Sequence, residues 1–233
     1  MKALRLKLYQ QTACYKKPFA FKVSETYPLP PYATVKGMLH ALLQATELIP
    51  MKLSIQGSYD TVISDYQTHY FFKKANTKEF ALTADGLGVD RDMSDVTTMP
   101  IYTQMLYDVE LLIHVQASDE VLRQLQDVIA NSAQHLSLGR WEDLVRVDAC
   151  EMVELREPEE DYPLKYNAYV PREWLDEGDF FPYKLNWTYR SVNHVRVWDK
   201  ISVGYVQHGF YLSSEEAPFY VDVHDDVVLF PSQ

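Results

Sequence analysis

The sequence has little cysteine and none of the short motifs that mark common catalytic or metal sites. Its two cysteines, Cys14 and Cys150, lie far apart and form no CxxC pair, so neither a disulfide framework nor a thiolate zinc site is expected. There is no P-loop, GxSxG or HExxH motif, and the seven histidines are not spaced as metal ligands. These absences predict a protein without metal or cofactor, in which both cysteines are small buried apolar residues.

Long hydrophobic runs are missing as well. No apolar stretch in the sequence approaches the roughly 20 residues that a membrane helix needs. The first residues, MKALRLKLYQQ, alternate charged and apolar side chains, which is unlike a signal peptide. A hydrophobic content of 47% and a charged content of 24% are typical of a soluble globular protein. We therefore expect a soluble, cytoplasmic protein with no membrane partner.

Basic residues are scarce except near the start of the chain. Residues 1–75 contain ten lysines and arginines against four acids, and the rest contains twelve against twenty-nine, for a net charge of −11. A basic N-terminal part on an acidic chain favours one anion-facing surface. The alternative is an uneven distribution of charge that has no binding role.

Hydrophobic periodicity predicts strands and helices in a definite order. The helix after the prolines has apolar residues at i, i+3, i+4, i+7 and i+8, with Thr34 as its N-cap and Pro50 as its end. The second helix is expected to stop at Gly139. The predicted order is strand 2–9, an extended run at 19–23, helix 34–48, strands 53–63 and 67–74, a polar excursion at 75–100, strand 102–115, helix 119–136 and strand 147–155.

This order is close to a β-α-β-β-α-β, ferredoxin-like (RRM-like) arrangement within the α+β class, whose open sheet face is a common RNA platform. We expect residues 1–155 to form that N-terminal domain, with the thumb-like excursion at 75–100 as a long functional loop. The acidic stretch at 157–161 is interrupted by Pro158 and predicts a solvated boundary. Residues 156–233, rich in aromatics and valine, predict a smaller β-rich C-terminal lobe.

The segment at 22–39, KVSETYPLPPYATVKGML, has the clearest local chemistry. Its prolines lead into a helix whose first turn has free N–H groups, the Thr34 hydroxyl and the Lys36 cation, a combination that binds phosphate well. Gly37 is costly inside a helix, and its presence indicates that another backbone or a nucleotide approaches closely. This segment therefore predicts an anion site.

A metal-free ribonuclease is the alternative use of the same segment. Such an enzyme needs a base, an acid and a cation for the phosphorane. Lys36 and His40 lie at i and i+4 on one helix face, and Tyr27 is a nearby hydroxyl. The simpler interpretation is that His40 partly covers the helix surface and that Lys36 only holds phosphate.

Two segments of the sequence resemble a known family. The 22–39 segment, together with Leu42 and Leu43, resembles the N-terminal signature of the CRISPR-associated Cas-five family, and SLGRWEDL at 137–144 resembles that family's glycine-containing loop and following strand. The intervening elements occur in the family's order, so the resemblance covers roughly residues 1–155. The N-terminal pattern is similar to that of the type I-B branch, in which a separate endonuclease cuts the guide precursor.

The resemblance implies a non-catalytic subunit of the Cascade surveillance complex that caps the 5′ end of the guide RNA (crRNA). Its implied partners are the 5′ handle, the repeated backbone subunit, the large subunit and, through the complex, target DNA, in antiviral defence or guided DNA targeting. The excursion corresponds to the family's thumb, which leans over the guide. The expected RNA contacts are Lys22, Ser24, Thr34, Lys36, Gly37, Lys73, Lys74, Arg91, Met93, Met99, Leu138, Gly139 and Arg140.

For the thumb residues Arg91, Met93 and Met99, ordinary loop positions remain an open alternative. For the whole chain, the runner-up is a metal-independent endoribonuclease that processes CRISPR repeat RNA. A third interpretation is a protein-interaction scaffold that has no role with RNA.

Overall fold

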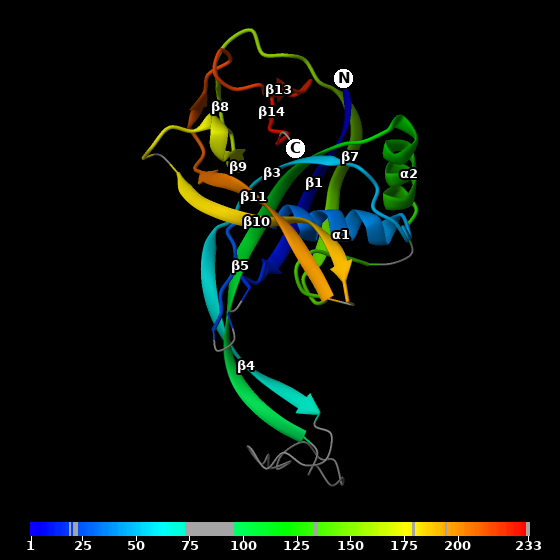
Figure 1. Cartoon of the computed structure of the whole chain (residues 1–233), viewed down its shortest axis with the longest axis vertical. Helices are drawn as coiled ribbons and strands as arrows, with labels where there is room; N and C mark the ends of the chain where they lie inside the picture. The colour runs from blue at the N-terminus through cyan, green and yellow to red at the C-terminus, as the bar shows by residue number, and fades with distance from the viewer. Residues whose placement is uncertain are drawn as a thin grey trace.

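The chain folds as an α+β protein built mainly from antiparallel strands, as the predicted class requires (Figure 1). A computed structural model describes residues 1–18, 20, 23–72, 96–132, 135–178, 180–193 and 195–231. Its main sheet has ten strands in the order β10-β11-β9-β3-β5-β1-β7-β6, with β2 and β4 also paired to β5. No helix in these described ranges is long and apolar enough to span a membrane.

The bounds of the elements are as follows. The main sheet contains β1 (Lys2–Ala13), β2 (Val23–Ser24), β3 (Lys52–Ser58), β4 (Thr61–Phe72), β5 (Val96–Gln116), β6 (Leu136–Ser137), β7 (Leu144–Glu154), β9 (Asn167–Pro171), β10 (Phe181–Val192) and β11 (Val195–Val206). Two small sheets pair β8 (Tyr162–Pro163) with β12 (Tyr211–Leu212) and β13 (Tyr220–Val221) with β14 (Val227–Val228). The helices are α1 (Tyr32–Leu42), α2 (Asp119–Ala130) and the short 3-10 turn η1 (Arg172–Trp174).

β1 lies in the middle of the sheet, between β5 and β7. The strand predicted over 2–9 is confirmed, and its pairing with β5 continues to Ala13. Leu4, Leu6 and Leu8 pack into the main core. Arg5, which the alternation assigns to the polar face, is also buried, because the C-terminal segment covers that face and supplies Asp222 and Asp226 as ion-pair partners.

Helix α1 begins two residues earlier than predicted and ends well before Pro50. Pro31 occupies the N-cap position without a side-chain cap, so Thr34 is not the N-cap; its backbone N–H donates to the Pro31 carbonyl. A proline is favourable here because its fixed φ suits the helix start and no helical N–H is lost. The helix stops at Leu42, followed by the C-cap Leu43 and by Gln44, which has a φ of 52°.

Helix α2 is shorter than predicted. Ser118 caps it by accepting a hydrogen bond from the Val121 N–H, and it ends at Ala130 instead of 136. Residues 136–137 instead form β6, which pairs with β7. The predicted C-terminal end of the helix was therefore wrong. Gly139 is therefore not the helix stop; it has a φ of 110° in the loop between β6 and β7.

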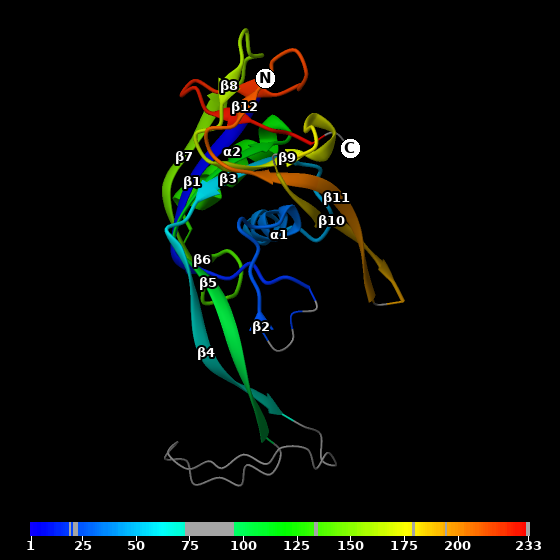
Figure 2. The same ribbon diagram turned by 90° about the vertical axis from the view of Figure 1, so that its left-hand side faces the viewer.

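Strands β4 and β5 form a long arm that extends away from the body of the molecule (Figures 1 and 2). The strands predicted at 53–63 and 67–74 have different bounds in the structure: β3 ends at Ser58, a turn follows, and β4 begins at Thr61. The last part of the predicted excursion, 96–100, is β5 strand paired with β4 from Phe72 onward. Long-range pairing with β4 extends β5 beyond the predicted 102–115. Residues 73–95 lie outside the described part of the chain.

The predicted C-terminal lobe is rich in strands, but its hairpin continues the N-terminal sheet. β9 pairs with β3 through Gln56 and Ala168, and β11 pairs with β9. The main core combines Leu185 and Trp187 of β10 with residues of β1, α1 and β3. A second apolar cluster gathers residues between 164 and 229. The boundary expected near residue 156 is therefore not a break in the sheet.

The β10–β11 hairpin curves over α1, so that the helix lies between the hairpin and the central strands (Figure 2). The termini lie at the opposite end of the molecule from the arm (Figures 1 and 2). This arrangement places residues of α1 opposite residues that follow them by about 150 positions.

Candidate nucleic-acid interface

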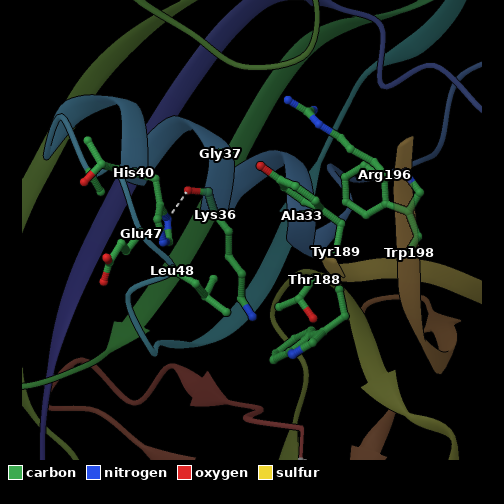
Figure 3. Close-up of a pocket in the computed structure, with 13 residues that line it drawn as sticks. Ala33, Lys36, Gly37, His40, Glu47, Leu48, Thr188, Tyr189, Arg196 and Trp198 are labelled. Carbon is green, nitrogen blue, oxygen red and sulfur yellow. Dashed lines mark hydrogen bonds between the residues drawn. The ribbon is translucent and has the colours of Figure 1, made fainter. Parts of the chain in front are cut away.

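A pocket of about 460 Å³ lies between α1 and the β10–β11 hairpin (Figure 3). Three of its side chains are aromatic and two are cationic, while Glu47 is its one acid. Aromatic and cationic side chains together are the usual lining of sites for single-stranded nucleic acid. The lining residues are Ala33, Lys36, Gly37, His40, Ala45, Thr46, Glu47, Leu48, Trp187, Thr188, Tyr189, Arg196 and Trp198.

Lys36 is the most unusual residue of the pocket. It is only 6% exposed, and its Nζ lies 3.3 Å above the centre of the Trp187 ring. No carboxylate in the described part of the chain forms an ion pair with it. Burial lowers the pKa of Lys36 from 10.5 to about 8, since the charged form is poorly solvated there. An anion in the pocket would relieve that cost.

The second cation of the pocket comes from the hairpin. The Arg196 guanidinium lies 4.7 Å from the centre of the Tyr189 ring, and Tyr189 packs edge-to-face on Trp198 at 5.3 Å between ring centres. In Figure 3 the Lys36 and Arg196 side chains point in opposite directions. The pocket therefore combines two separate cations with three aromatic rings.

Gly37 opens the helix side of the pocket. A Cβ placed on Gly37 would meet no other atom within 4 Å, so no part of the described chain fills the space that a side chain would take. The close approach predicted for this glycine is thus not made by the described protein itself. The space is open to a ligand.

A second hollow of about 300 Å³ adjoins the first near the start of α1. It includes the predicted residues Thr34 and Tyr27, together with Lys16, and it shares Ala33 and Trp198 with the larger pocket. The two hollows therefore follow each other along one side of α1. Thr34 lines the smaller hollow, and Lys36 and Gly37 line the larger pocket.

His40 lines the pocket but uses both of its ring nitrogens within the protein. Nδ1 lies 2.7 Å from the Lys36 carbonyl oxygen (Figure 3), and Nε2 accepts the Ile49 backbone N–H at 2.9 Å. Since Nε2 accepts, the ring proton is on Nδ1 and donates to the carbonyl. The third residue of the ribonuclease hypothesis, Tyr27, lines the other hollow, and burial raises the pKa of its hydroxyl. These three residues do not share one pocket.

The SLGRWEDL segment forms a loop held by the buried carboxylate of Asp143. Its Oδ2 accepts hydrogen bonds from the backbone N–H groups of Cys14 at 3.0 Å and Arg140 at 2.8 Å, and its Oδ1 lies 2.7 Å from the Arg140 guanidinium. A Cβ on Gly139 would approach Asp143 Oδ2 to 2.8 Å and the Cys14 carbonyl to 3.0 Å. The loop therefore requires glycine at this position.

This arrangement limits which of the predicted loop residues can contact RNA. Leu138 is buried, and Arg140 also pairs with Glu142 at 3.0 Å, so its charge is already balanced within the loop. Trp141, by contrast, is 86% exposed. Trp141 was not among the residues predicted to bind RNA, although a tryptophan between charged residues in a tight loop is a recognisable signal.

The remaining predicted contacts lie near or on the arm. Ser24 is only 3% exposed, because its strand β2 pairs with β5 at the base of the arm. Met99 of β5 is 36% exposed. Lys22, Lys73, Lys74, Arg91 and Met93 lie outside the described residues.

The arm also has exposed tyrosines that were not predicted as site residues. Tyr66 and Tyr102 are cross-strand partners whose ring centres lie 5.3 Å apart, and Tyr70 is exposed on the same face of β4. The alternation of Tyr66 and Tyr70 along a strand carries this signal in the sequence. Elsewhere, no three histidine, cysteine or acidic side chains in the described ranges are grouped to hold a metal ion.

The fold and the pocket define a mainly antiparallel α+β protein with a cationic, aromatic groove beside its first helix. The family described as CRISPR-associated protein (Cas_Cas5) matches residues 3–230. The chain therefore belongs to this CRISPR-associated family, and the resemblance seen in residues 1–155 extends over nearly the whole chain.

One solved structure has a similar fold. A chain of a structure titled "CRISPR RNA-guided surveillance complex" is similar with a TM-score of 0.52 at 14% identity, covering 88% of this chain and 90% of that one. A CRISPR protein from Archaeoglobus fulgidus is similar with a TM-score of 0.45 at 11% identity, covering 100% of both chains. The search of curated proteins found no match.

Proposed function

We propose that this chain is a non-catalytic subunit of a type I CRISPR Cascade surveillance complex that binds the 5′ handle of the guide RNA and caps one end of the backbone filament. The single observation that carries the proposal is the buried ammonium of Lys36, which forms no ion pair with a carboxylate of the described residues, in a pocket lined by aromatic rings. A protein stabilises such a charge poorly by itself, and a phosphate of the handle compensates it.

The proposed division of the chain follows its topology. β1, α1, β3, β5, α2 and β7 occur in the order of a ferredoxin-like domain, with β7-β1-β5-β3 as neighbours in the sheet. We assign RNA binding to this N-terminal domain, within residues 1–155, and a supporting role to residues 156–233. The exposed arm would contact the guide and the neighbouring backbone subunit, and the large subunit would reach target DNA.

Binding without cleavage is favoured by the state of His40. A general base needs a free ring nitrogen within reach of the RNA 2′-hydroxyl, and the Ile49 N–H occupies Nε2 while Nδ1 is bonded to the Lys36 carbonyl. Breaking either bond would loosen the end of α1. We therefore assign His40 to the structure of the helix end.

The proposal is tested by purifying the chain from cells that also make its neighbouring subunits and a CRISPR array. We expect co-purifying RNA of uniform length that shares one 5′ handle. The variant Lys36→Met removes the charge and keeps a long apolar side chain, so the RNA should be lost or strongly reduced. The matched control is Lys184→Met, which removes an exposed lysine of β10.

Two results would refute the proposal. One is a preparation with neither RNA nor other subunits attached to the wild-type chain. The other is magnesium-free cleavage of repeat RNA by the pure chain that His40→Ala abolishes, which would establish the ribonuclease instead.

A further inference from the structure

The β10–β11 hairpin contributes as much of the pocket as helix α1 does. Trp187, Thr188, Tyr189, Arg196 and Trp198 all come from it. These residues lie in the part of the chain in which the sequence showed no motif. Two of them, Tyr189 and Trp198, form the edge-to-face aromatic pair.

From this geometry we infer that the hairpin and α1 together hold one unpaired nucleotide of the guide RNA, with its base against Tyr189 and Trp198 and its flanking phosphates at Lys36 and Arg196. The inference rests on the proposed function and extends it to the C-terminal hairpin. It makes the hairpin a direct RNA-binding element as well as part of the sheet.

The size and lining of the pocket fit a nucleotide. Its volume of about 460 Å³ falls in the range of about 300–1,000 Å³ that is usual for small-ligand pockets. Aromatic rings and an arginine plane accept any base by stacking. Arg196 is not ion-paired to any acid in the described part of the chain, in contrast to Arg190 of the same hairpin, which pairs with Asp199 at 3.2 Å.

The positions of the two cations favour a nucleotide within a strand over a free nucleotide. The Lys36 and Arg196 side chains point in opposite directions (Figure 3), so each can meet a different phosphate of one chain. The adjoining hollow, which shares Ala33 and Trp198, gives the strand a path toward the start of α1. The open space at Gly37 leaves room for the sugar-phosphate backbone at the helix surface.

A base can enter only if it is unpaired, because stacking against Tyr189 and Trp198 needs a free base face. The occupant is therefore a single-stranded segment. Since stacking accepts every base, we expect the pocket to select an unpaired nucleotide by its position in the RNA and not by its identity.

The test uses the complex assembled with guide RNA in which single uridines are replaced by 4-thiouridine. Irradiation should cross-link one handle position to the peptide that contains Tyr189 or to the one that contains Trp198. Cross-links confined to peptides outside 185–198, in a complex that retains its RNA, would overturn the inference while leaving the proposed function intact.

Variants provide the second readout. Trp198→Ala and Arg196→Ala should each release the guide about tenfold faster or more, measured by displacement with unlabelled RNA. Arg190→Ala is the matched control, because its side chain pairs with Asp199 and does not line the pocket. Wild-type release from both pocket variants, with Lys36→Met still defective, would overturn the inference alone; a wild-type complex without RNA would remove the proposed function as well.

Discussion

The amine of Lys36 lies 3.3 Å above the centre of the Trp187 ring, so a residue of the first helix packs on one that follows it by about 150 positions. The indole face partly compensates the buried charge through a cation–π interaction. It does not replace an anion, and the pKa of Lys36 stays lowered to about 8. Under the proposed function, Lys36 is therefore a residue at which folding and RNA binding have opposite requirements.

Lys36→Met should stabilise the chain while it weakens RNA binding. Met keeps the apolar contact with Trp187 and removes the desolvated charge, so we expect the free energy of unfolding at pH 7 to rise by about 1–3 kcal/mol. Urea denaturation measures this change. A loss of stability in Lys36→Met would mean that the cation–π contact outweighs the cost of burial.

The gain in the free energy of unfolding from Lys36→Met should become smaller at high pH. Between pH 8 and 10.5, the values for folded and unfolded Lys36, the unfolded chain binds more protons than the folded chain, so wild-type stability rises with pH. The gap between wild type and variant therefore closes over that window, as urea denaturation at pH 7 and pH 10 would show. Lys184→Met, which retains Lys36, is the control.

Gly37→Ala should have opposite effects on protein stability and on RNA binding. Alanine is better than glycine inside a helix by about 0.5–1 kcal/mol, and its Cβ meets nothing within 4 Å. We expect a more stable chain that releases guide RNA faster. Thermal unfolding and RNA displacement measure the two effects. Unchanged RNA release would show that the space at Gly37 is not used by the ligand.

Asp143→Ala should disrupt the 138–143 loop. The substitution removes the acceptor for two backbone N–H groups and leaves the Arg140 charge without its buried partner, a loss of about 3 kcal/mol for such a pair. The control Asp148→Ala removes an exposed pair with Arg146 and should cost less than about 1 kcal/mol. Equal losses in the two variants would contradict the role assigned to Asp143.

Asp222→Asn should reduce stability mainly above pH 4. Burial alone would raise the pKa of Asp222, but hydrogen bonds from His114 and from the backbone N–H groups of His224 and Asp226 outweigh it and lower the pKa to about 2. A depressed folded pKa contributes stability above the ordinary value of 3.8, which is lost as the pH falls toward 2.

We expect Asp222→Asn to lose about 2 kcal/mol at pH 6 and to show less acid dependence than wild type between pH 4 and 2. Asp225→Asn, in an exposed pair with Arg156, is the control. An acid transition with the wild-type pH dependence in Asp222→Asn would contradict this role. Chemical denaturation at several pH values makes the comparison.

Local sequence determined the elements whose side chains follow a clear period. The alternation of Leu4, Leu6 and Leu8 predicted β1, and the apolar repeat that includes Val35 and Leu39 predicted α1, because each pattern buries one face. The family resemblance was likewise visible in short segments. The ends of the helices were not predictable to the residue, because partner strands and the proline cap decide them.

Only the tertiary structure decided what surrounds these elements. Lys36 and Gly37 could be named as an anion site, but their aromatic partners come from β10 and β11, which no local pattern connects to α1. The sequence pattern placed Arg5 on the polar face of a strand and Arg140 at an RNA contact, and the structure pairs them with Asp222 and Asp143. Charge and periodicity are properties of neighbouring residues in the sequence, whereas compensation of a charge depends on which distant residues the sheet brings together.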